Sequence, residues 1–353
     1  ALSEEDKRRY DLDEDEDYVE VLYRILLERE PDESGKRFYL EQMESGKLSR
    51  RDVLNQLLTS KEARYRNRFK YDYKEVMRNF VEVYPSDSFE PWVSERPYEG
   101  AQLCELVNPR KWLIDDWRAH LDELDLSSSL QLMHRKGFEW AQTLWGLRRL
   151  GMIHDETRCL GVGSGHETIL YWLANHVGEV VATDLYEGYW VDEGSREGDP
   201  EVLDNPAKYA PFEYREDRLR FLRMDGRDLE FDDDSFDVVF SLSSIEHFGG
   251  NAGAAAAMAE MGRVCRPDGI VVVATELILN DSVHPEFFTL EELREHVVAA
   301  SGMKLVQRPE FVVPSYALAH PCVMPEEAFR APHIVLDFDG VLDTSVLLFF
   351  RHD

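Results

Sequence analysis

The sequence predicts an α/β protein: a seven-stranded, mostly parallel sheet with helices on both faces, preceded by a small N-terminal all-α module. Two patterns carry this prediction. From residue 158 onward, short apolar stretches alternate with segments that have apolar residues at helical spacing, whereas residues 17–58 show the helical spacing throughout. A chain of 353 residues is long enough for one large domain and one smaller domain.

Residues 157–187 form the unit that most clearly indicates a function. An apolar strand ends at Gly163-Ser164-Gly165, where small residues let the backbone turn sharply and approach a ligand. A helix with one apolar face follows, and a second strand then delivers Asp184 at its carboxyl end. An acid at that place can accept two hydrogen bonds from a ribose diol. The unit therefore predicts one half of a nucleoside-binding site.

The details of the turn argue against a dinucleotide. The sequence fingerprint of dinucleotide-binding proteins has a third glycine at the position of His166. The pyrophosphate of a dinucleotide bound at this turn would meet Glu167. An acidic side chain would repel a pyrophosphate, but it suits a cofactor whose reactive centre is a sulfonium cation.

At this point the chain resembles the class I S-adenosylmethionine-dependent methyltransferases. Gly161, Gly163 and Gly165 match their G-x-G-x-G motif, although Cys159 replaces the acid that usually comes two residues before the first glycine. The resemblance covers residues 130–353 and implies a Rossmann-like methyltransferase sheet with S-adenosylmethionine as the cofactor.

The resemblance also implies roles for residues at the strand ends. Asp184 would hold the ribose, Asp225 the adenine amino group, and the Gly226 amide an adenine ring nitrogen; Asp228 is a nearby alternative to Asp225. The complete predicted cofactor-binding set is Gly161, Gly163, Gly165, Glu167, Asp184, Leu185, Asp225, Gly226 and Ser241.

The remaining elements follow in the expected order. A helix is expected over residues 130–150, and a capping box, Thr289 to Glu292, opens a later helix. The region 186–217 is too long for an ordinary connection. The other expected elements are strands at 219–223, 238–242, 270–275, 303–307 and 344–350, a helix at 252–264 and a turn at 266–269.

The end of the fourth strand carries the candidate catalytic residues. Histidine is the most frequent general base, which makes His247 the first candidate, with Glu246 or the Ser243 and Ser244 hydroxyls orienting it or the substrate. The alternative is that His247 only caps the following loop. His284 follows the fifth strand and could face the same pocket.

Two further signals are set aside. Glu246 and His247, with His284 or Glu276, could bind a metal, but neighbouring residues at a strand end point apart, so no metal site is predicted. The stretch 337–344 is similar to the nucleophile motif of haloacid-dehalogenase-type phosphatases. Too few residues follow it for that chemistry, and it predicts a turn before the last strand.

The predicted domains are an acidic tail at 1–16, a helical module at 17–69, a connector or lid at 70–128 and a methyltransferase domain at 129–353. The module resembles a phycobilisome-linker-like domain of unknown function that is often joined to enzymes of cell-surface polysaccharide assembly. This implies a possible protein partner through residues 17–69, or only a packing appendage. A basic run at 64–78 could contact an anionic glycan or a lipid-linked phosphate, or be a solvated helix face.

The composition of the chain limits the classes of molecule that it is expected to bind. A formal net charge of −30 argues against nucleic acid or an anionic membrane, and also fits a salt-adapted protein. The four cysteines are far apart, which predicts buried free thiols. A polar N-terminus and the lack of a long apolar run predict a cytoplasmic protein without membrane insertion.

The predicted function is S-adenosylmethionine-dependent O-methylation of a sugar hydroxyl of a cell-surface glycan or its precursor. A small-metabolite acceptor is one alternative. A second is a cofactor-binding assembly factor without turnover that acts through the helical module. No particular oligomeric state is predicted.

Overall fold

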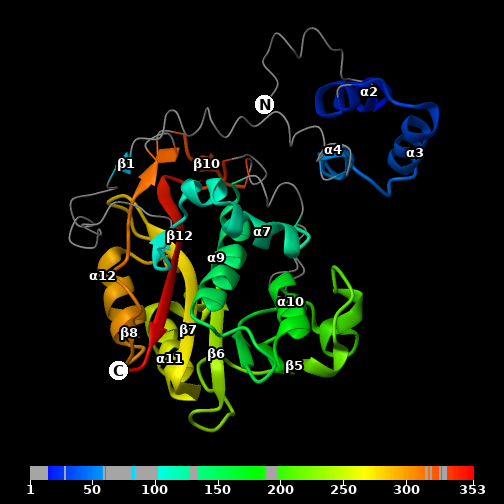
Figure 1. Ribbon diagram of the computed structural model, residues 1–353. Helices are drawn as coiled ribbons and strands as arrows, with labels where there is room; N and C mark the ends of the chain where they lie inside the picture. Colours follow the sequence, from blue (N-terminus) through cyan, green and yellow to red (C-terminus); the bar gives the residue numbers. More distant parts are fainter. Residues whose placement is uncertain are drawn as a thin grey trace. The chain divides into compact units, whose positions relative to one another are not determined.

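The computed structural model divides the chain into two compact units (Figure 1). One unit comprises residues 1–73 with 127–132, and the other comprises residues 74–126 with 133–353. The residues that the structure describes are 15–27, 29–58, 60, 82–83, 102–126, 133–187, 198–314, 317–318, 320–325, 327 and 332–353. Most of the predicted acidic tail, the basic run at 64–78 and most of the connector lie outside these residues.

The first unit is helical, as predicted for residues 17–58. Its helices are α2 (Asp15–Leu26), α3 (Glu33–Glu44) and α4 (Arg50–Leu58). Asp32 caps α3 by accepting a hydrogen bond from the Gly35 amide. Val19, Leu22 and Tyr23 of α2 pack with Val53 and Leu57 of α4 in one apolar core. Phe38 on α3 is 51% exposed.

The second unit is built on the predicted parallel sheet. In spatial order its central strands are β12 (Val341–Arg351), β7 (Cys265–Ile278), β6 (Phe236–Leu242), β3 (Arg158–Val162), β4 (Glu179–Asp184) and β5 (Leu219–Arg223). The five strands from β7 to β5 pair in parallel, and β12 is antiparallel to β7. The turn expected at 266–269 is part of β7, which has a register shift against β6 at this place.

The outer edge of β12 explains why the sheet has more strands than predicted. The expected strand at 303–307 is present as β8 (Lys304–Leu305), antiparallel to β12. Two further short strands, β2 (Glu105–Leu106) and β11 (Leu336–Phe338), pair with other parts of β12. A third, β10 (Cys322–Val323), pairs in parallel with the outer side of β11. The sheet thus has ten strands. A separate pair joins β1 (Glu82–Val83) to β9 (Val313–Pro314).

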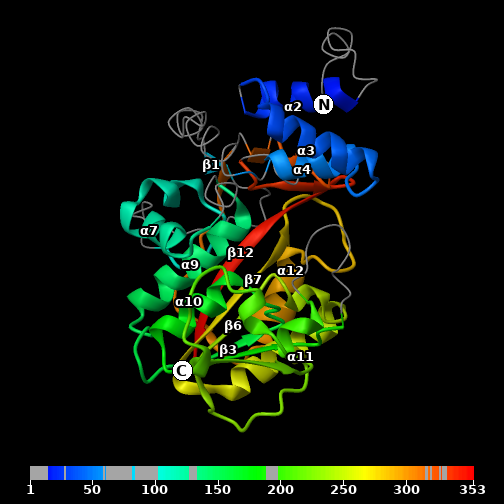
Figure 2. The ribbon, with the colours of Figure 1, turned by 90° about the vertical axis from the view of Figure 1, so that its right-hand side faces the viewer.

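Helices cover both faces of the sheet (Figure 2). On one face lie α7 (Asp115–Glu123), α9 (Arg135–Arg149) and α10 (Thr168–His176); on the other lie α11 (Gly250–Val264), α12 (Leu290–Glu292) and the π-helix η8 (Leu293–Ala299). The expected helix at 130–150 begins at Arg135, after its N-cap His134; residues 130–132 lie outside the described part. The predicted capping box at Thr289 and Glu292 is present.

Several shorter segments complete this unit. The long region after β4 contains three short 3₁₀ helices, η4 (Pro200–Leu203), η5 (Pro206–Lys208) and η6 (Glu216–Arg218), and its residues 188–197 lie outside the described part. Another, η7 (Ile245–His247), follows β6, and η2 (Pro109–Leu113) precedes α7.

Three further predictions can be compared with the structure. Asp339 and Gly340 form the predicted turn, which joins β11 to β12 as a hairpin. All four cysteines are buried and free, as expected. In the described part of the chain, no helix is both long and apolar enough to cross a membrane.

Candidate active site

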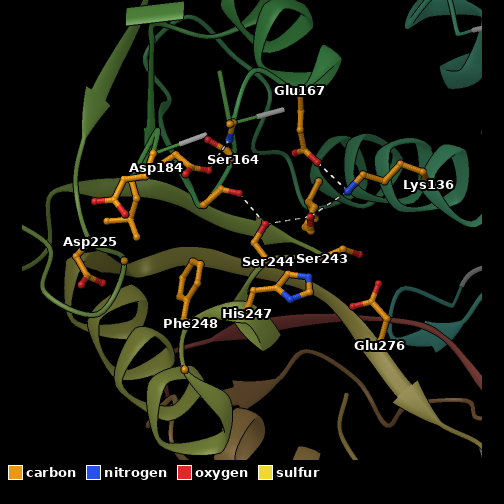
Figure 3. Close-up of a pocket in the computed structure, with 18 of the residues that line it drawn as sticks. Lys136, Ser164, Glu167, Asp184, Asp225, Ser243, Ser244, His247, Phe248 and Glu276 are labelled. Carbon is orange, nitrogen blue, oxygen red and sulfur yellow. Dashed lines mark hydrogen bonds and ion pairs between the residues drawn. The ribbon is translucent and has the colours of Figure 1, made fainter. Parts of the chain in front are cut away.

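The carboxyl ends of the parallel strands open into a cavity of about 680 Å³ (Figure 3). This is the edge at which open α/β sheets bind ligands. The predicted site residues that line it are Gly163, Gly165, Glu167, Asp184, Leu185, Asp225, Gly226 and His247. The start of α9 and the end of β7 also contribute to the lining.

The glycine turn after β3 is fastened to the end of β4. Gly163 and Gly165 have φ angles of 62° and 45°, which few other residues adopt readily. The Gly165 amide donates to Asp184 Oδ2 at 3.0 Å, and the Tyr186 hydroxyl donates to the Gly165 carbonyl at 2.9 Å. Turn and acid therefore form one preorganised corner of the cavity.

The position of the Phe248 ring explains why residues 163 and 226 are glycines, a reason that the sequence did not reveal. A Cβ atom at Gly163 would lie 2.6 Å from Cζ of the Phe248 ring, and one at Gly226 would lie 2.6 Å from its Cε2. Both distances are too short for a real contact. A larger residue at either position would therefore displace the ring, which Figure 3 shows between Asp225 and His247.

Asp225 lines the cavity but is already paired. It accepts hydrogen bonds from Arg227 Nε at 2.9 Å and from Arg227 Nη2 at 2.6 Å. These bonds, with the Arg227 charge, lower the pKa of Asp225. Arg227 Nη1 also donates to the Phe248 carbonyl, so the pair ties the end of β5 to the end of β6.

Glu167, predicted to face a cation, forms an ion pair with Lys136 at the start of α9. Lys136 Nζ lies 2.9 Å from Glu167 Oε1 and 3.2 Å from Glu139 Oε2, and donates to the Leu242 carbonyl at 3.0 Å. One ammonium group thus joins α9, the glycine turn and the end of β6. Glu139 also contacts the Arg135 guanidinium at 3.2 Å, so each of the two carboxylates has a cationic partner.

His247 faces the cavity between two carboxyl groups. Its Nδ1 lies 3.3 Å from Glu286 Oε2, and its Nε2 lies 3.7 Å from Glu246 Oε1. Glu246 itself is fully buried and accepts a hydrogen bond from the Thr275 hydroxyl at 2.8 Å. An imidazolium at His247 would therefore have a carboxyl group near each ring nitrogen.

Glu246 and Glu276 are buried neighbours with opposite pKa shifts. Burial and the charge of Glu276 hold the pKa of Glu246 well above its usual range. Burial by itself also raises the pKa of Glu276, but the Arg135 guanidinium outweighs it, and the pKa is lowered to about 2. Near neutral pH Glu276 is ionised and Glu246 holds a proton.

The other predicted residues lie outside the cavity lining. Gly161 is inside β3, where a Cβ atom would lie 2.7 Å from Ser164 Oγ, and Ser241 and Glu246 are buried. His284 differs from the expectation that it faces the same pocket. Its Nδ1 instead accepts the Glu286 and Phe287 amides, both at 3.2 Å, and its ring stacks on Phe287.

The two serines after β6 have different surroundings. Ser244 Oγ donates to the Gly163 carbonyl at 2.6 Å and so supports the turn. Ser243 has a φ angle of 55°, which is uncommon for a residue other than glycine, and it lines the cavity. Its hydroxyl oxygen is buried and has no hydrogen-bond partner among the described residues. Strained residues of this kind gather at functional sites.

Comparison with known proteins defines the class. A family model described as a methyltransferase domain matches residues 160–273, and one described as a domain of unknown function (DUF4214) matches residues 1–67. The strand order, the glycine turn and this match identify a class I S-adenosylmethionine-dependent methyltransferase domain, and S-adenosylmethionine is its cofactor. No curated protein matches the chain.

Solved structures with a similar fold include three methyltransferases. A TehB-like S-adenosylmethionine-dependent methyltransferase from Corynebacterium glutamicum is 17% identical (TM-score 0.34; 61% of this chain and 96% of that chain covered). Phosphoethanolamine N-methyltransferase 2 from Haemonchus contortus, in complex with S-adenosyl-L-methionine, is 16% identical (TM-score 0.39; 60% of this chain and 52% of that chain covered). An S-adenosylmethionine-dependent methyltransferase from Aquifex aeolicus is 15% identical (TM-score 0.37; 66% of this chain and 97% of that chain covered).

Proposed function

We propose that this methyltransferase domain methylates a hydroxyl group, and that the acceptor is a sugar of a cell-surface glycan or its precursor. The observation that carries the proposal is His247, which lines the cavity with a carboxyl group near each ring nitrogen. An alcohol is a poor nucleophile until its proton has a place to go, whereas a neutral amine needs no such base.

We assign the cofactor contacts to the cavity corner around the glycine turn. Asp184 would accept hydrogen bonds from the ribose hydroxyls, and the exposed apolar side chain of Leu185 would cover one face of the adenine. Asp225 and the Gly226 amide would meet the adenine edge. The residues fit this role because Gly163, Gly165, Asp184 and Leu185 line one continuous cavity, and because Asp184 is already oriented by the Gly165 amide.

When bound, S-adenosylmethionine supplies an electrophilic methyl group on a sulfonium centre. His247 would take the proton of the acceptor hydroxyl as the new oxygen–carbon bond forms. The carboxylate of Glu286, 3.3 Å from His247 Nδ1, would stabilise the resulting imidazolium. The walls of the cavity hold both reactants in place and exclude water, which is where most of the catalytic gain of such a displacement arises.

The sugar assignment has a second source of support. The family model DUF4214 matches residues 1–67, and the resemblance of this module to phycobilisome-linker-like domains implies company with enzymes of cell-surface polysaccharide assembly. It would attach the enzyme to a partner or guide a glycan to it.

Two measurements test the proposal. Calorimetry should show binding of S-adenosylmethionine and S-adenosylhomocysteine but not of NAD. Transfer of a radiolabelled methyl group to a panel of methyl glycosides, sugar nucleotides and small amines, with products identified by mass spectrometry, should give a methyl ether of a sugar. Methylation of amines alone would contradict the proposal. Tight cofactor binding without any transfer would instead favour a non-catalytic assembly factor.

A further inference from the structure

Ser243, the residue directly after β6, has a strained backbone. Among the described residues that line the cavity, it is the only one other than glycine with a left-handed conformation, at a φ angle of 55°. Gly163, Gly165 and Gly249 line the cavity with positive φ angles as well, but glycine adopts them without a steric clash. In serine the Cβ atom then lies too close to the following carbonyl oxygen. Figure 3 shows Ser243 on the same side of the cavity as His247.

The surrounding chain holds Ser243 in this conformation. The carbonyl of Leu242, directly before it, accepts a 3.0 Å hydrogen bond from the Lys136 ammonium group. The Ser243 amide donates to the Ala274 carbonyl of β7 at 2.8 Å. The hydroxyl of Ser244, directly after it, donates to the glycine turn at 2.6 Å. Because contacts on both sides fix the backbone, Ser243 does not relax to a more favourable φ angle without breaking one of them.

The Ser243 hydroxyl adds a second unfavourable feature. Its oxygen is buried and has no hydrogen-bond partner among the described residues. A buried polar group that makes no hydrogen bond loses its contacts with water and gains none in return. Glycine at this position would avoid both the strained φ angle and the unpaired hydroxyl. The stability of the folded protein therefore does not explain a serine here, whereas a ligand that forms a hydrogen bond with the hydroxyl would explain it.

We infer that Ser243 is an acceptor-binding residue, and that its hydroxyl forms a hydrogen bond with a hydroxyl group of the acceptor other than the one that is methylated. The inference rests on the proposed function and specifies its acceptor site. Serine and sugar hydroxyls can each donate and accept a hydrogen bond, so they are suited to pair with each other. A hydrogen bond donated to the reacting oxygen would compete for the lone pair that attacks the methyl group, so we assign the contact to a second hydroxyl.

The place of Ser243 in the fold favours the acceptor over the cofactor as this ligand. We assign the ribose and adenine contacts to Asp184 and Asp225, at the ends of β4 and β5. Ser243 instead lies between β6 and η7, the 3₁₀ helix that carries His247. A contact with Ser243 is therefore made on the side of the cavity where the proposed base meets the acceptor hydroxyl.

The first experiment measures thermal unfolding of the wild type, Ser243→Gly and Ser243→Ala without an acceptor. Ser243→Gly should unfold about 2 to 4 °C higher than the wild type, because glycine relieves the strain of the left-handed conformation. Ser243→Ala keeps the strain but loses the unpaired hydroxyl, so it should unfold no lower than the wild type. Lower unfolding temperatures for both variants would show that the hydroxyl stabilises the folded protein and would overturn the inference.

The second experiment measures binding of sugars to each protein saturated with S-adenosylhomocysteine. The probes are methyl β-D-glucopyranoside, methyl β-D-galactopyranoside, methyl α-D-mannopyranoside and their monodeoxy analogues, observed by proton NMR at millimolar concentration. Ser243→Ala and Ser243→Gly should bind the glycoside that the wild type prefers about 2- to 10-fold more weakly, which corresponds to the loss of one hydrogen bond between neutral groups. Affinity for S-adenosylhomocysteine should stay unchanged.

The monodeoxy analogues identify the sugar hydroxyl that pairs with Ser243. Removal of that hydroxyl should weaken binding about 2- to 10-fold in the wild type but change it little in Ser243→Ala, because the two hydroxyls act as a pair. In the transfer assay Ser243→Ala should raise KM and leave kcat nearly unchanged, since the contact is made in the bound substrate as well as in the transition state. Analogues that lose the same affinity in both proteins at every ring position would contradict the pairing and overturn the inference.

Ser241→Ala is the matched control. Ser241 lies on β6, and its buried hydroxyl also has no hydrogen-bond partner among the described residues, but it does not line the cavity. Its replacement removes a similar group near the end of the same strand without removing a cavity hydroxyl, so sugar binding should stay unchanged. Equal loss of sugar binding in Ser241→Ala and Ser243→Ala would show that the effect arises from packing at this strand end and would overturn the inference.

Two other results would also overturn it: wild-type protein that binds none of the glycosides, and Ser243→Ala that binds them as the wild type does. Failure of the proposed function has a different signature. In that case S-adenosylhomocysteine would not bind, or methyl transfer would go to amines alone.

Discussion

The carboxylate of Asp184, at the end of β4, accepts a 3.0 Å hydrogen bond from the Gly165 amide in the turn after β3. Its other oxygen accepts the Tyr186 amide at 3.2 Å. A carboxylate can accept about four hydrogen bonds, so these backbone contacts are compatible with further bonds to a ribose. The acid is thus oriented by the protein itself before a nucleoside binds.

Replacing this acid should weaken cofactor binding. Asp184→Ala would remove two charge-assisted hydrogen bonds to the ribose, each worth roughly 1.5 to 3 kcal/mol, so affinity for S-adenosylhomocysteine should fall at least about tenfold. Calorimetry measures the change. Asp228→Ala is the control, because Asp228 follows the same strand as Asp225 but does not line the cavity. Equal affinities of Asp184→Ala and wild type would exclude the ribose role.

Replacing His247 should affect turnover rather than cofactor binding. His247→Ala should lower kcat by roughly 10² to 10⁴ on the identified acceptor, while the Kd for S-adenosylhomocysteine stays near the wild-type value. His284→Ala should leave kcat nearly unchanged, since His284 packs on Phe287 outside the cavity. Near-normal turnover by His247→Ala would mean that another group takes the proton or that none is needed.

The buried acid Glu246 should make stability depend on pH. Its folded-state pKa is raised, so the stability it contributes is present below its unfolded pKa, near 4.5, and is lost as the pH rises toward the folded value. Glu246→Gln mimics the protonated acid and does not titrate. Its stability relative to wild type should increase above pH ~4.5, by at most about 1.4 kcal/mol per pH unit. Denaturant unfolding of both proteins at several pH values from about 5 to about 8 would measure this difference in stability.

Glu260→Gln provides a control of opposite sign. Arg263 lowers the pKa of Glu260, so the stability from this acid is present above the unfolded pKa and is lost as the pH falls. This variant should be less stable than wild type near neutral pH and approach it in acid. A relative stability of Glu246→Gln that does not change with pH would show that Glu246 is ionised in the folded protein.

Deleting residues 1–69 should preserve cofactor binding. The core of the helical module is formed by its own residues, among them Val19, Tyr23, Val53 and Leu57. All residues that line the cavity come after residue 133. The truncated protein should bind S-adenosylhomocysteine with the same Kd as the full chain. Insoluble protein or lost binding would show that the module and the enzyme domain share one core.

The sequence was sufficient to predict the parallel strands along the chain, and the glycine turn and acid that meet at their carboxyl ends. A strand that ends in Gly163-Ser164-Gly165 and one that ends in Asp184 are local patterns, and parallel strands bring their carboxyl ends to one edge. The same reasoning placed Asp225 and His247 after their strands, and the four cysteines in buried positions. These features depend on a few consecutive residues, which is why the sequence alone determined them.

Only the tertiary structure decided the other half of the cavity and the edge of the sheet. The contact between Arg135 and Glu276 joins residues 141 positions apart, and no spacing rule connects them. The strands β2, β8 and β11 have two or three residues each, too few for a periodic pattern, and form only because β12 offers them an open edge. His284 and Glu286 are two residues apart, yet only Glu286 reaches His247, because side-chain direction in a loop is set by packing and not by sequence order.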